Sequence, residues 1–376
     1  MFYNNARIFG PDLQFHIGSF EVKNGYFSEV FSSAVPDDAI DLEGKTVIPG
    51  LIDVHCHGCC GHDFSDGDYD GLVRMAEHLA KCGVTSFVPA SMSLPYNALE
   101  AAFVNAKRFC DESGGGISVL RGIHMEGPFL SSAKRGAQNA EHLTKPDFEA
   151  FKYLNDKCGG LIKIVDIAPE LSGAIEFIKK AKDICTVSIA HTDADHSMAR
   201  AAIDAGATHL THLFNAMPGI HHRKVGVIEA AAESENVYAE IICDGYHVHP
   251  AAIRLAFSVF KDRMILISDS GRCEGMPNGT EFELGGQTAR LTDGLGLLTD
   301  GTIACSAVNL WQCLNNAIRF GIPEEAAVRA ATYTPALSIG VSDNVGSIES
   351  GKHADFIICN ADYTQKRVFI GGNEVL

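Results

Sequence analysis

Six side chains that can bind a metal ion or carry a proton stand at or near the ends of short apolar runs in this sequence. They are His55, His57, Glu126, His191, His212 and Asp269. If the runs are parallel strands of one barrel, their C-terminal ends meet at one rim, and these distant residues converge there. Imidazole and carboxylate groups bind zinc, iron, manganese and related divalent ions. A cation held by such ligands lowers the pKa of bound water toward neutrality, so the pattern indicates metal-assisted hydrolysis.

Each of these residues also has an ordinary structural interpretation. A single histidine at a strand end is usually a hydrogen-bonded rim or core residue. Glu126, in HMEGP, fits a capping or salt-bridging carboxylate, and Asp269, in ISDSG, fits a helix N-cap. Strand alternation, however, places His55 and His57 on one face and Cys56 on the other. The metal interpretation therefore rests on the combined placement of the six residues.

Eight apolar runs of strand length alternate with amphipathic segments of helix length from about residue 49 onward. The runs cover 51–57, 84–90, 117–125, 161–169, 185–191, 207–214, 237–244 and 264–270. Helical segments cover 71–82, 98–111, 171–182, 197–205 and 251–260. This α/β pattern predicts a (β/α)8 TIM barrel over residues 49–335. An open doubly wound sheet is the rival, but its first strand would usually lead into a glycine-rich phosphate loop.

The two ends of the chain read as strands outside this barrel. ARIF, FEVKNGYFSEV and KTVIP lie within residues 1–48, and Asn24-Gly25 is a strong hairpin signal. The segments EFELGGQTARLTDG and LGLLTDGTIA predict further hairpins, followed by helices near 306–320 and 323–332. The tail after His353 returns to strands. We expect residues 1–48 and 336–376 to form one small β domain.

Composition narrows the classes of function. Against 30 Lys and Arg there are 47 Asp and Glu, which gives a net charge of −17 over 376 residues. The chain has no dense run of Lys and Arg of the kind that binds nucleic acid. Because the net charge is negative, an anionic substrate would need a local cationic site. We expect no membrane span. The absence of a secretory signal and the 12 scattered cysteines suggest reduced thiols in the cytoplasm.

Several other residues are weaker candidates for function. Cys56, Cys59 and Cys60 lie beside the two histidines, and Cys56-x-x-Cys59 superficially resembles a redox or zinc pair. The sequence has no second such pair, so a structural role is favoured for these cysteines. The cluster His221-His222-Arg223 fits either a solvated loop or an anion site. The chain contains no Gly-x-Ser-x-Gly elbow, so a serine hydrolase is unsupported.

Long motifs also carry a family resemblance. VIPGLIDVHCHG resembles the first barrel strand of the amidohydrolase superfamily, and GSIESGKHADFIICN resembles its return into a small β-sandwich domain. GIHMEGPFLSSAKRGAQN, AHTDAD, THLFNAMPGIHHRKVGVIEA, ICDGYHVHP and ISDS are similar to N-acetylglucosamine-6-phosphate deacetylases. The matches keep their order from about residue 47 to 360, which covers nearly the whole chain.

The resemblance implies roles for the six rim residues. Glu126, His191 and His212 match the principal metal ligands. His55 and His57 match a pair that holds a second ion in some members, with Glu126 as the bridge. Asp269 matches the catalytic carboxylate, near the second ion. One or two divalent ions are expected, with zinc or iron foremost and manganese, cobalt, nickel or cadmium as alternatives.

The resemblance also implies a substrate and a homodimer. Gln138 matches the position beside the acetamido group, and Asn215 and Ala216 match sugar-phosphate contacts. Arg223 and His247 match phosphate contacts, one of which can come from the neighbouring subunit. The implied reaction removes the acetyl group of N-acetylglucosamine 6-phosphate.

Departures from the family pattern leave alternatives open. Gln138 stands where many members have histidine, Gly271 and Arg272 replace a small apolar run, and Cys305 replaces a glycine. An N-acetylgalactosamine-6-phosphate deacetylase would use nearly the same residues, and a non-catalytic binding protein of the superfamily would have lost some of them. A dihydroorotase-like enzyme fits less well, because Lys163 lies too early in its strand.

Overall fold

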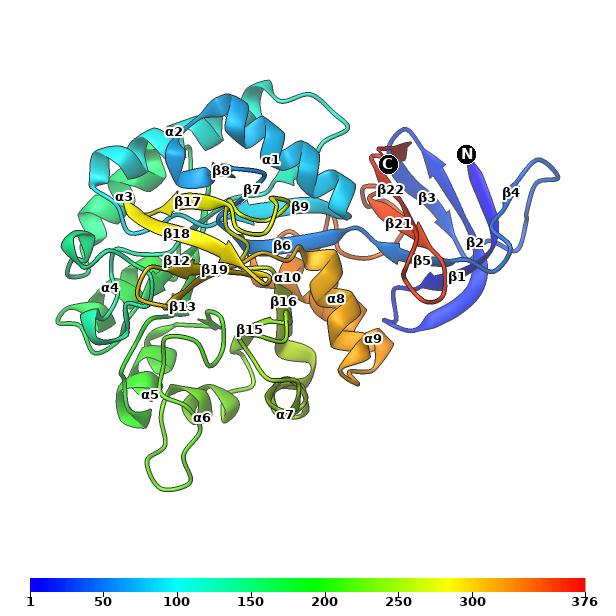
Figure 1. The fold of residues 1–376 in the computed structure, drawn as a ribbon. Helices are drawn as coiled ribbons and strands as arrows, with labels where there is room; N and C mark the ends of the chain where they lie inside the picture. Colours follow the sequence, from blue (N-terminus) through cyan, green and yellow to red (C-terminus); the bar gives the residue numbers. More distant parts are fainter. Residues whose placement is uncertain (376) are drawn as a thin grey trace.

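The computed structural model describes residues 1–375 and forms a parallel barrel with a β sheet beside it (Figure 1). The barrel strands are β6 (Leu51–Cys56), β9 (Val84–Pro89), β10 (Val119–Leu120) with β11 (Ile123–Met125), β12 (Ile162–Ile167), β13 (Thr186–Ile189), β14 (His209–Leu210), β15 (Tyr238–Ile242) and β16 (Met264–Ile267). Each falls within one of the eight predicted runs. The third strand is divided, because β10 pairs with β9 whereas β11 pairs with β12.

Backbone hydrogen bonds close the barrel between its first and last strands. The Asp269 N–H donates to the His55 carbonyl at 2.9 Å, and the His57 N–H donates to the Ser270 carbonyl at 2.7 Å. These bonds lie at the C-terminal ends of β6 and β16. They therefore hold the His-x-His segment directly beside Asp269.

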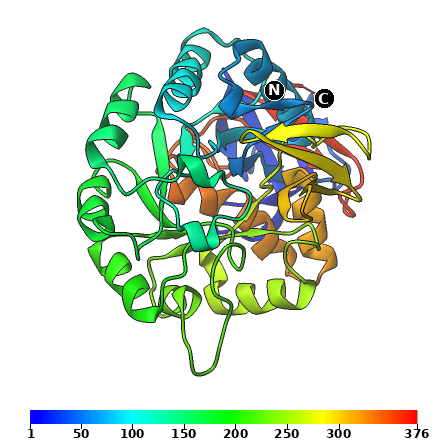
Figure 2. The same cartoon turned by 60° about the vertical axis from the view of Figure 1, so that its left-hand side comes forward.

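Helices surround the barrel (Figure 2). They are α1 (Tyr69–Cys82), α2 (Tyr96–Glu112), α3 (Phe148–Lys157), α4 (Ala174–Ala181), α5 (His196–Ala205), α6 (Val227–Ala232), α7 (Pro250–Phe260), α8 (Leu310–Arg319), α9 (Glu324–Ala331) and α10 (Tyr333–Ser338). The sequence analysis did not name α3, α6 and α10. The last two have six residues each, too few for an apolar period to show. None of the helices described is long and apolar enough to cross a membrane.

The apolar core lies mainly between the strands and the helices. Along β15, Ala239 and Ile241 belong to this helix-facing cluster, whereas Ile242 belongs to a second one. Strand alternation therefore turns Glu240 and Ile242 toward the barrel interior. Cys56 packs in the helix-facing cluster, as the alternation predicted.

Both chain ends build the small sheet. Its strand order is β23-β22-β21-β5-β1-β2-β3, with β4 beside β1. These strands are β1 (Phe2–Phe9), β2 (Phe15–Lys23), β3 (Tyr26–Val30), β4 (Ile40–Asp41), β5 (Thr46–Pro49), β21 (Phe356–Cys359), β22 (Lys366–Ile370) and β23 (Asn373–Glu374). Asn24 and Gly25 both have positive φ, as a tight hairpin requires.

We predicted a β sandwich, and the strands from both chain ends form a single hydrogen-bonded sheet. This sheet has its own aromatic core, in which the rings of Phe356 and Phe369 stack with centroids 4.4 Å apart. Ala336 and Ile339 instead pack with interior barrel residues such as Ile242. The exact domain limits at residues 48 and 336 remain a prediction.

A separate four-stranded antiparallel sheet lies at the C-terminal rim of the barrel. It contains β17 (Glu281–Leu284), β18 (Gln287–Thr292), β19 (Leu295–Leu298) and β20 (Ile303–Ser306), where the sequence predicted two hairpins. Gln287 donates from Nε2 to the Ala137 carbonyl at 2.6 Å. This contact joins the sheet to the loop that follows β11.

Candidate active site

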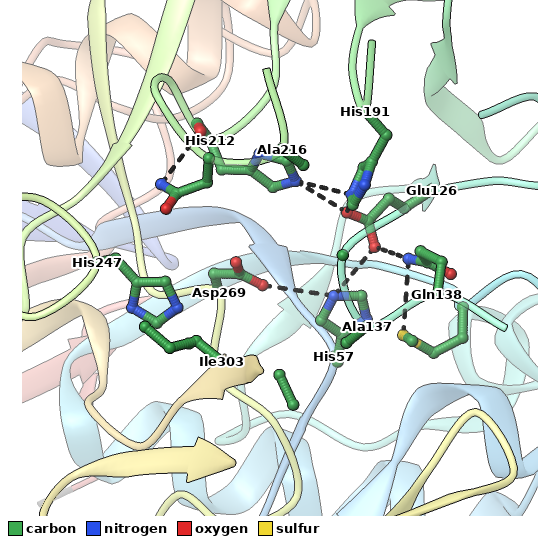
Figure 3. A pocket seen from close by; sticks show the side chains of 14 residues that line it. His57, Glu126, Ala137, Gln138, His191, His212, Ala216, His247, Asp269 and Ile303 are labelled. Carbon is green, nitrogen blue, oxygen red and sulfur yellow. Dashed lines mark hydrogen bonds and ion pairs between the residues drawn. The ribbon is translucent and has the colours of Figure 1, made fainter. Parts of the chain in front are cut away.

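A cavity opens at the C-terminal rim of the barrel, and most of the predicted site residues line it (Figure 3). The lining residues that the sequence predicted are His57, Glu126, Gln138, His191, His212, Asn215, Ala216, His247 and Asp269. His55 lies behind them and is fully buried. Arg223 is not part of this lining. The strand ends therefore bring together residues separated by more than two hundred positions.

Glu126 is the centre of the site. One of its oxygens, Oε1, lies 3.0 Å from His191 Nε2 and 3.1 Å from His212 Nε2. The two imidazole nitrogens are themselves 3.1 Å apart. Three ligand atoms from three different strand ends thus converge on one point, in a site that is almost closed to solvent. This arrangement fits a divalent cation.

A second set of ligand atoms shares Glu126 with the first. Glu126 Oε2 lies 3.3 Å from His57 Nε2, and Glu126 Oε1 lies 3.7 Å from His55 Nε2. His55 Nε2 is buried and has no hydrogen-bond partner within residues 1–375. A buried nitrogen without a partner is costly, and a cation between His55, His57 and Glu126 would satisfy it. Glu126 therefore belongs to both ligand sets, and the residues present would hold two ions.

Asp269 lies against the second set. Its Oδ1 is 3.6 Å from His55 Nε2 and 3.4 Å from His57 Nε2. Burial acts to raise the pKa of Asp269, but the charges of His55 and His57 outweigh it and hold this pKa below the ordinary value. Asp269 is therefore an ionised carboxylate at neutral pH, and its side chain lines the cavity.

Three site residues just beyond strand ends have a left-handed backbone conformation. His191 has φ 42°, His212 has φ 30° and Asp269 has φ 46°. Such residues cost about 1–3 kcal/mol each and persist where the surrounding structure imposes them. Each of the three lies two residues beyond the end of a barrel strand. Other non-glycine residues with positive φ occur elsewhere in the chain, but these three carry ligand-type side chains at one rim.

Hydrogen bonds on the far side of the imidazoles fix their orientation. His57 donates from Nδ1 to the Ala90 carbonyl at 3.1 Å, and His191 donates from Nδ1 to the Lys134 carbonyl at 2.9 Å. A proton on Nδ1 leaves Nε2 free to bind a metal. His55 Nδ1 contacts Glu240 Oε2 at 3.0 Å in the same manner.

A buried polar network beneath the site was not predicted from the sequence. Glu240 contacts His209 Nε2 at 3.1 Å as well as His55, and His124 Nε2 lies 2.9 Å from Asp166 Oδ1. All five side chains are fully buried. The available signal was a charged residue inside an otherwise apolar strand, in VYAEIICD and LIKIVDIAP. Such residues are rarely buried without a partner.

Replacing the carboxylate that orients His55 is expected to weaken the site without removing a ligand. Burial acts to raise the pKa of Glu240, but His55, His209 and His124 hold it well below the usual range, so the group is charged. Glu240→Gln should lower metal affinity or turnover about 10- to 100-fold, the typical effect of losing such a partner. Metal titration and kcat measurements check this, with Glu235→Gln on the surface as the control. Unchanged values for both would contradict the orienting role.

The predicted substrate residues occupy the wall of the cavity. Gln138 is held at both ends of its amide, because Oε1 accepts from the Ser93 N–H at 2.7 Å and Nε2 donates to Glu126 Oε2 at 2.6 Å. His247 Nδ1 lies 2.6 Å from Asp244 Oδ2, which orients its ring. Met92 and Ile303 add apolar lining that the sequence analysis did not identify. The wall thus combines polar and apolar groups.

Arg223 stands apart from these residues. It lies in the exposed loop between β14 and α6, which extends beyond the ring of helices (Figure 2). Arg223 is not among the residues that line the cavity of its own chain. A role for Arg223 at a site of this type would require a neighbouring subunit.

A metal-binding barrel with ligands at its strand ends is the architecture of the amidohydrolases. The sequence profile described as "Amidohydrolase family" matches residues 46–375. The chain is 36% identical over 357 residues to N-acetylglucosamine-6-phosphate deacetylase of Bacillus subtilis (strain 168), covering 91% of this chain and 90% of that protein. It is 31% identical over 340 residues to N-acetylgalactosamine-6-phosphate deacetylase of Escherichia coli O157:H7, covering 90% of each.

A solved structure agrees over the whole fold. A mutant of N-acetyl-D-glucosamine-6-phosphate deacetylase from Mycobacterium smegmatis, in complex with N-acetyl-D-glucosamine-6-phosphate, matches with a TM-score of 0.94 and 29% identity. The match covers 100% of this chain and 99% of that one. The chain belongs to the N-acetylglucosamine-6-phosphate deacetylase family of the amidohydrolase superfamily.

Proposed function

We propose that this protein hydrolyses the acetamido group of N-acetylglucosamine 6-phosphate to give glucosamine 6-phosphate and acetate. The observation that carries the proposal is the pair of buried ligand sets that share Glu126, with Asp269 beside one of them. Similarity to N-acetylglucosamine-6-phosphate deacetylases over nine-tenths of the chain supports the substrate class. A non-catalytic protein of the superfamily would have no need to keep this complete set.

We assign one or two divalent ions to these ligands, with zinc or iron expected foremost. His191, His212 and Glu126 would hold one, and His55, His57 and Glu126 the other. When bound, such an ion activates water and polarises the amide carbonyl. Because Glu126 belongs to both ligand sets, the two sets lie side by side.

The chain's own residues supply proton transfer and positioning. Asp269 accepts a proton from the attacking water and returns it to the amine as the C–N bond breaks. The amide of Gln138, fixed from both ends, presents its Nε2–H beside Glu126 and orients the acetamido group. Asn215, Ala216 and His247 contact the sugar phosphate on the remaining wall. The products are a free amine and acetate.

Phosphate recognition in this proposal uses Arg223 from a second copy of the chain. The charge of −17 opposes an anionic substrate at long range, so a local cation is needed. An arginine fork binds two phosphate oxygens at once. Because Arg223 lies outside its own cavity, we propose a homodimer in which this loop reaches the partner's site.

Removing that arginine should impair binding of the phosphate specifically. Arg223→Ala is expected to raise KM for the phosphorylated sugar about 10- to 100-fold, the value of a charge-assisted hydrogen-bonded pair, while metal content stays constant. Lys224→Ala removes the same charge from the neighbouring position and serves as the control. Steady-state kinetics on both variants check this, and an unchanged KM in Arg223→Ala would remove this residue from the phosphate site.

N-acetylgalactosamine 6-phosphate is the second candidate substrate. The relative from Escherichia coli O157:H7 named for that activity is 31% identical to this chain, close to the 36% of the Bacillus subtilis relative. The two sugars differ only at C4. Comparing kcat/KM for both epimers tests the assignment, and we expect the larger value for the glucosamine derivative. A larger value for the galactosamine derivative would reassign the substrate.

We place the enzyme in the cytoplasm. All 12 cysteines are free thiols in the part of the chain that the structure describes, including Cys273 and Cys305, whose Sγ atoms lie 3.7 Å apart. Reduced thiols are typical of a reducing compartment.

A further inference from the structure

Two triads of metal-ligand type lie outside the proposed catalytic site and share His78. We call them together the thiol cluster: Cys59, Cys60, His78, Cys82 and Glu274. It joins three segments. Cys59 ends β7 (Gly58–Cys59), His78 and Cys82 lie in the last turns of α1, and Glu274 lies in the loop after β16. The catalytic cavity includes none of these five among its lining residues.

His78 is the centre of the cluster. Its Nε2 lies 2.6 Å from Glu274 Oε2 and 3.4 Å from Cys82 Sγ. His78 and Cys82 are four residues apart in one helix and so project from the same face. The ligand atoms of His78, Cys82 and Glu274 all lie within 4.8 Å of one another, and the same is true of Cys59, Cys60 and His78.

The donor atoms and their surroundings favour a borderline-soft cation. Thiolate, imidazole and carboxylate are the ligands that zinc takes in tetrahedral sites. Glu274 is buried, whereas His78, Cys60 and Cys82 are partly exposed, so an ion can enter from solvent. A hydrogen bond from Cys59, together with the charge of His78, overcomes burial and lowers the pKa of the Cys60 thiol to about 7.

The backbone already holds the two loops of the cluster together. The Cys60 N–H donates to the Glu274 carbonyl at 2.7 Å, and the Gly61 N–H donates to the Arg272 carbonyl at 2.8 Å. The first loop follows His57 directly, and the second follows Asp269. An ion here would therefore tie both segments to α1.

We propose that the thiol cluster binds a divalent zinc-type cation in a structural site separate from the catalytic one. The triad of His78, Cys82 and Glu274 supplies three ligands, and Cys60, from the triad that shares His78, supplies the fourth. Cys59 lies beside Cys60 but is fully buried, and it is not among the proposed ligands. The proposal does not depend on the proposed function, because it shares no ligand with the site around Glu126.

Cobalt substitution tests the proposal, because sulfur ligands have their own signature. Protein purified from cells grown with Co²⁺ should show the near-ultraviolet band of thiolate-to-cobalt charge transfer. The site around Glu126 offers only nitrogen and oxygen and cannot produce that band. Cys60→Ser combined with Cys82→Ser should abolish the band and lower bound cobalt by one ion per chain. Cys110→Ser, at an exposed cysteine on α2, should leave both unchanged.

Two results would overturn the proposal. One is a cobalt-loaded wild-type protein that shows the weak visible bands of nitrogen and oxygen ligation but no thiolate band. The other is a thiolate band that survives intact in the double variant. The wild-type spectrum decides the matter even if the double variant does not fold. Loss of deacetylase activity does not enter this test, so failure of the catalytic assignment stays distinguishable.

Discussion

Asp269→Asn is expected to lower acetate release about 10³-fold or more, which combines loss of the proton acceptor with loss of a buried negative charge. Asparagine has the same shape, but its amide cannot accept the proton of water at neutral pH or return it to the leaving amine. The side chain faces His55 and His57 at 3.6 and 3.4 Å. The effect should fall on kcat, while KM for the sugar phosphate changes little.

The controls for this variant are metal content and fold. Glu126, His191 and His212 do not need Asp269 to converge, so at least one ion per chain should remain. Asp70→Asn, at an exposed helix position, should retain full activity. If Asp269→Asn turns over at the wild-type rate with its metal bound, Asp269 is not the proton carrier.

Glu126→Gln is expected to remove both metal and activity. This carboxylate contacts His191, His212 and His57 within 3.3 Å and is common to both ligand sets. An amide at this position offers one weak oxygen ligand, and its N–H₂ faces imidazole nitrogens. We expect bound metal to fall well below one ion per chain and acetate release to become undetectable. Metal analysis of the purified variant checks this directly.

The contrast between the two variants separates their roles. Asp269→Asn should keep metal and lose turnover, whereas Glu126→Gln should lose both. Glu141→Gln, an exposed glutamate in the same loop region, controls for the loss of one negative charge. A Glu126→Gln protein that keeps its full metal content would show that the two ligand sets are not bridged as described.

The convergence of the site could be predicted from the sequence because it depends only on strand ends. Alternation placed His55 and His57 on one face, and the barrel pattern placed Glu126, His191 and His212 at the same rim. The structure brings all of them together. The proposed substrate contacts Gln138 and His247 came from the family resemblance, and both side chains line the cavity.

The rest depended on contacts that local sequence does not encode. In the sequence, three polar residues simply interrupt apolar strands: Glu240, Asp166 and His124. Only the closed barrel shows their partners, because Glu240 contacts His55 and His209, and His124 contacts Asp166. Ile303 lines the cavity because the sheet formed by β17, β18, β19 and β20 lies at the C-terminal rim of the barrel. Pairing between hairpins is long-range, so neither turn signals nor periodicity indicates which wall they cover.

Metal-dependent amide hydrolysis is the central claim, and acetate release from N-acetylglucosamine 6-phosphate before and after metal removal tests it most directly. Protein stripped with a chelator and dialysed should release no acetate, and adding back zinc or iron in amounts matched to bound metal should restore the rate. Acetate released at full rate by metal-free protein, or none from protein whose metal content has been restored, would contradict the assignment of the Glu126 site.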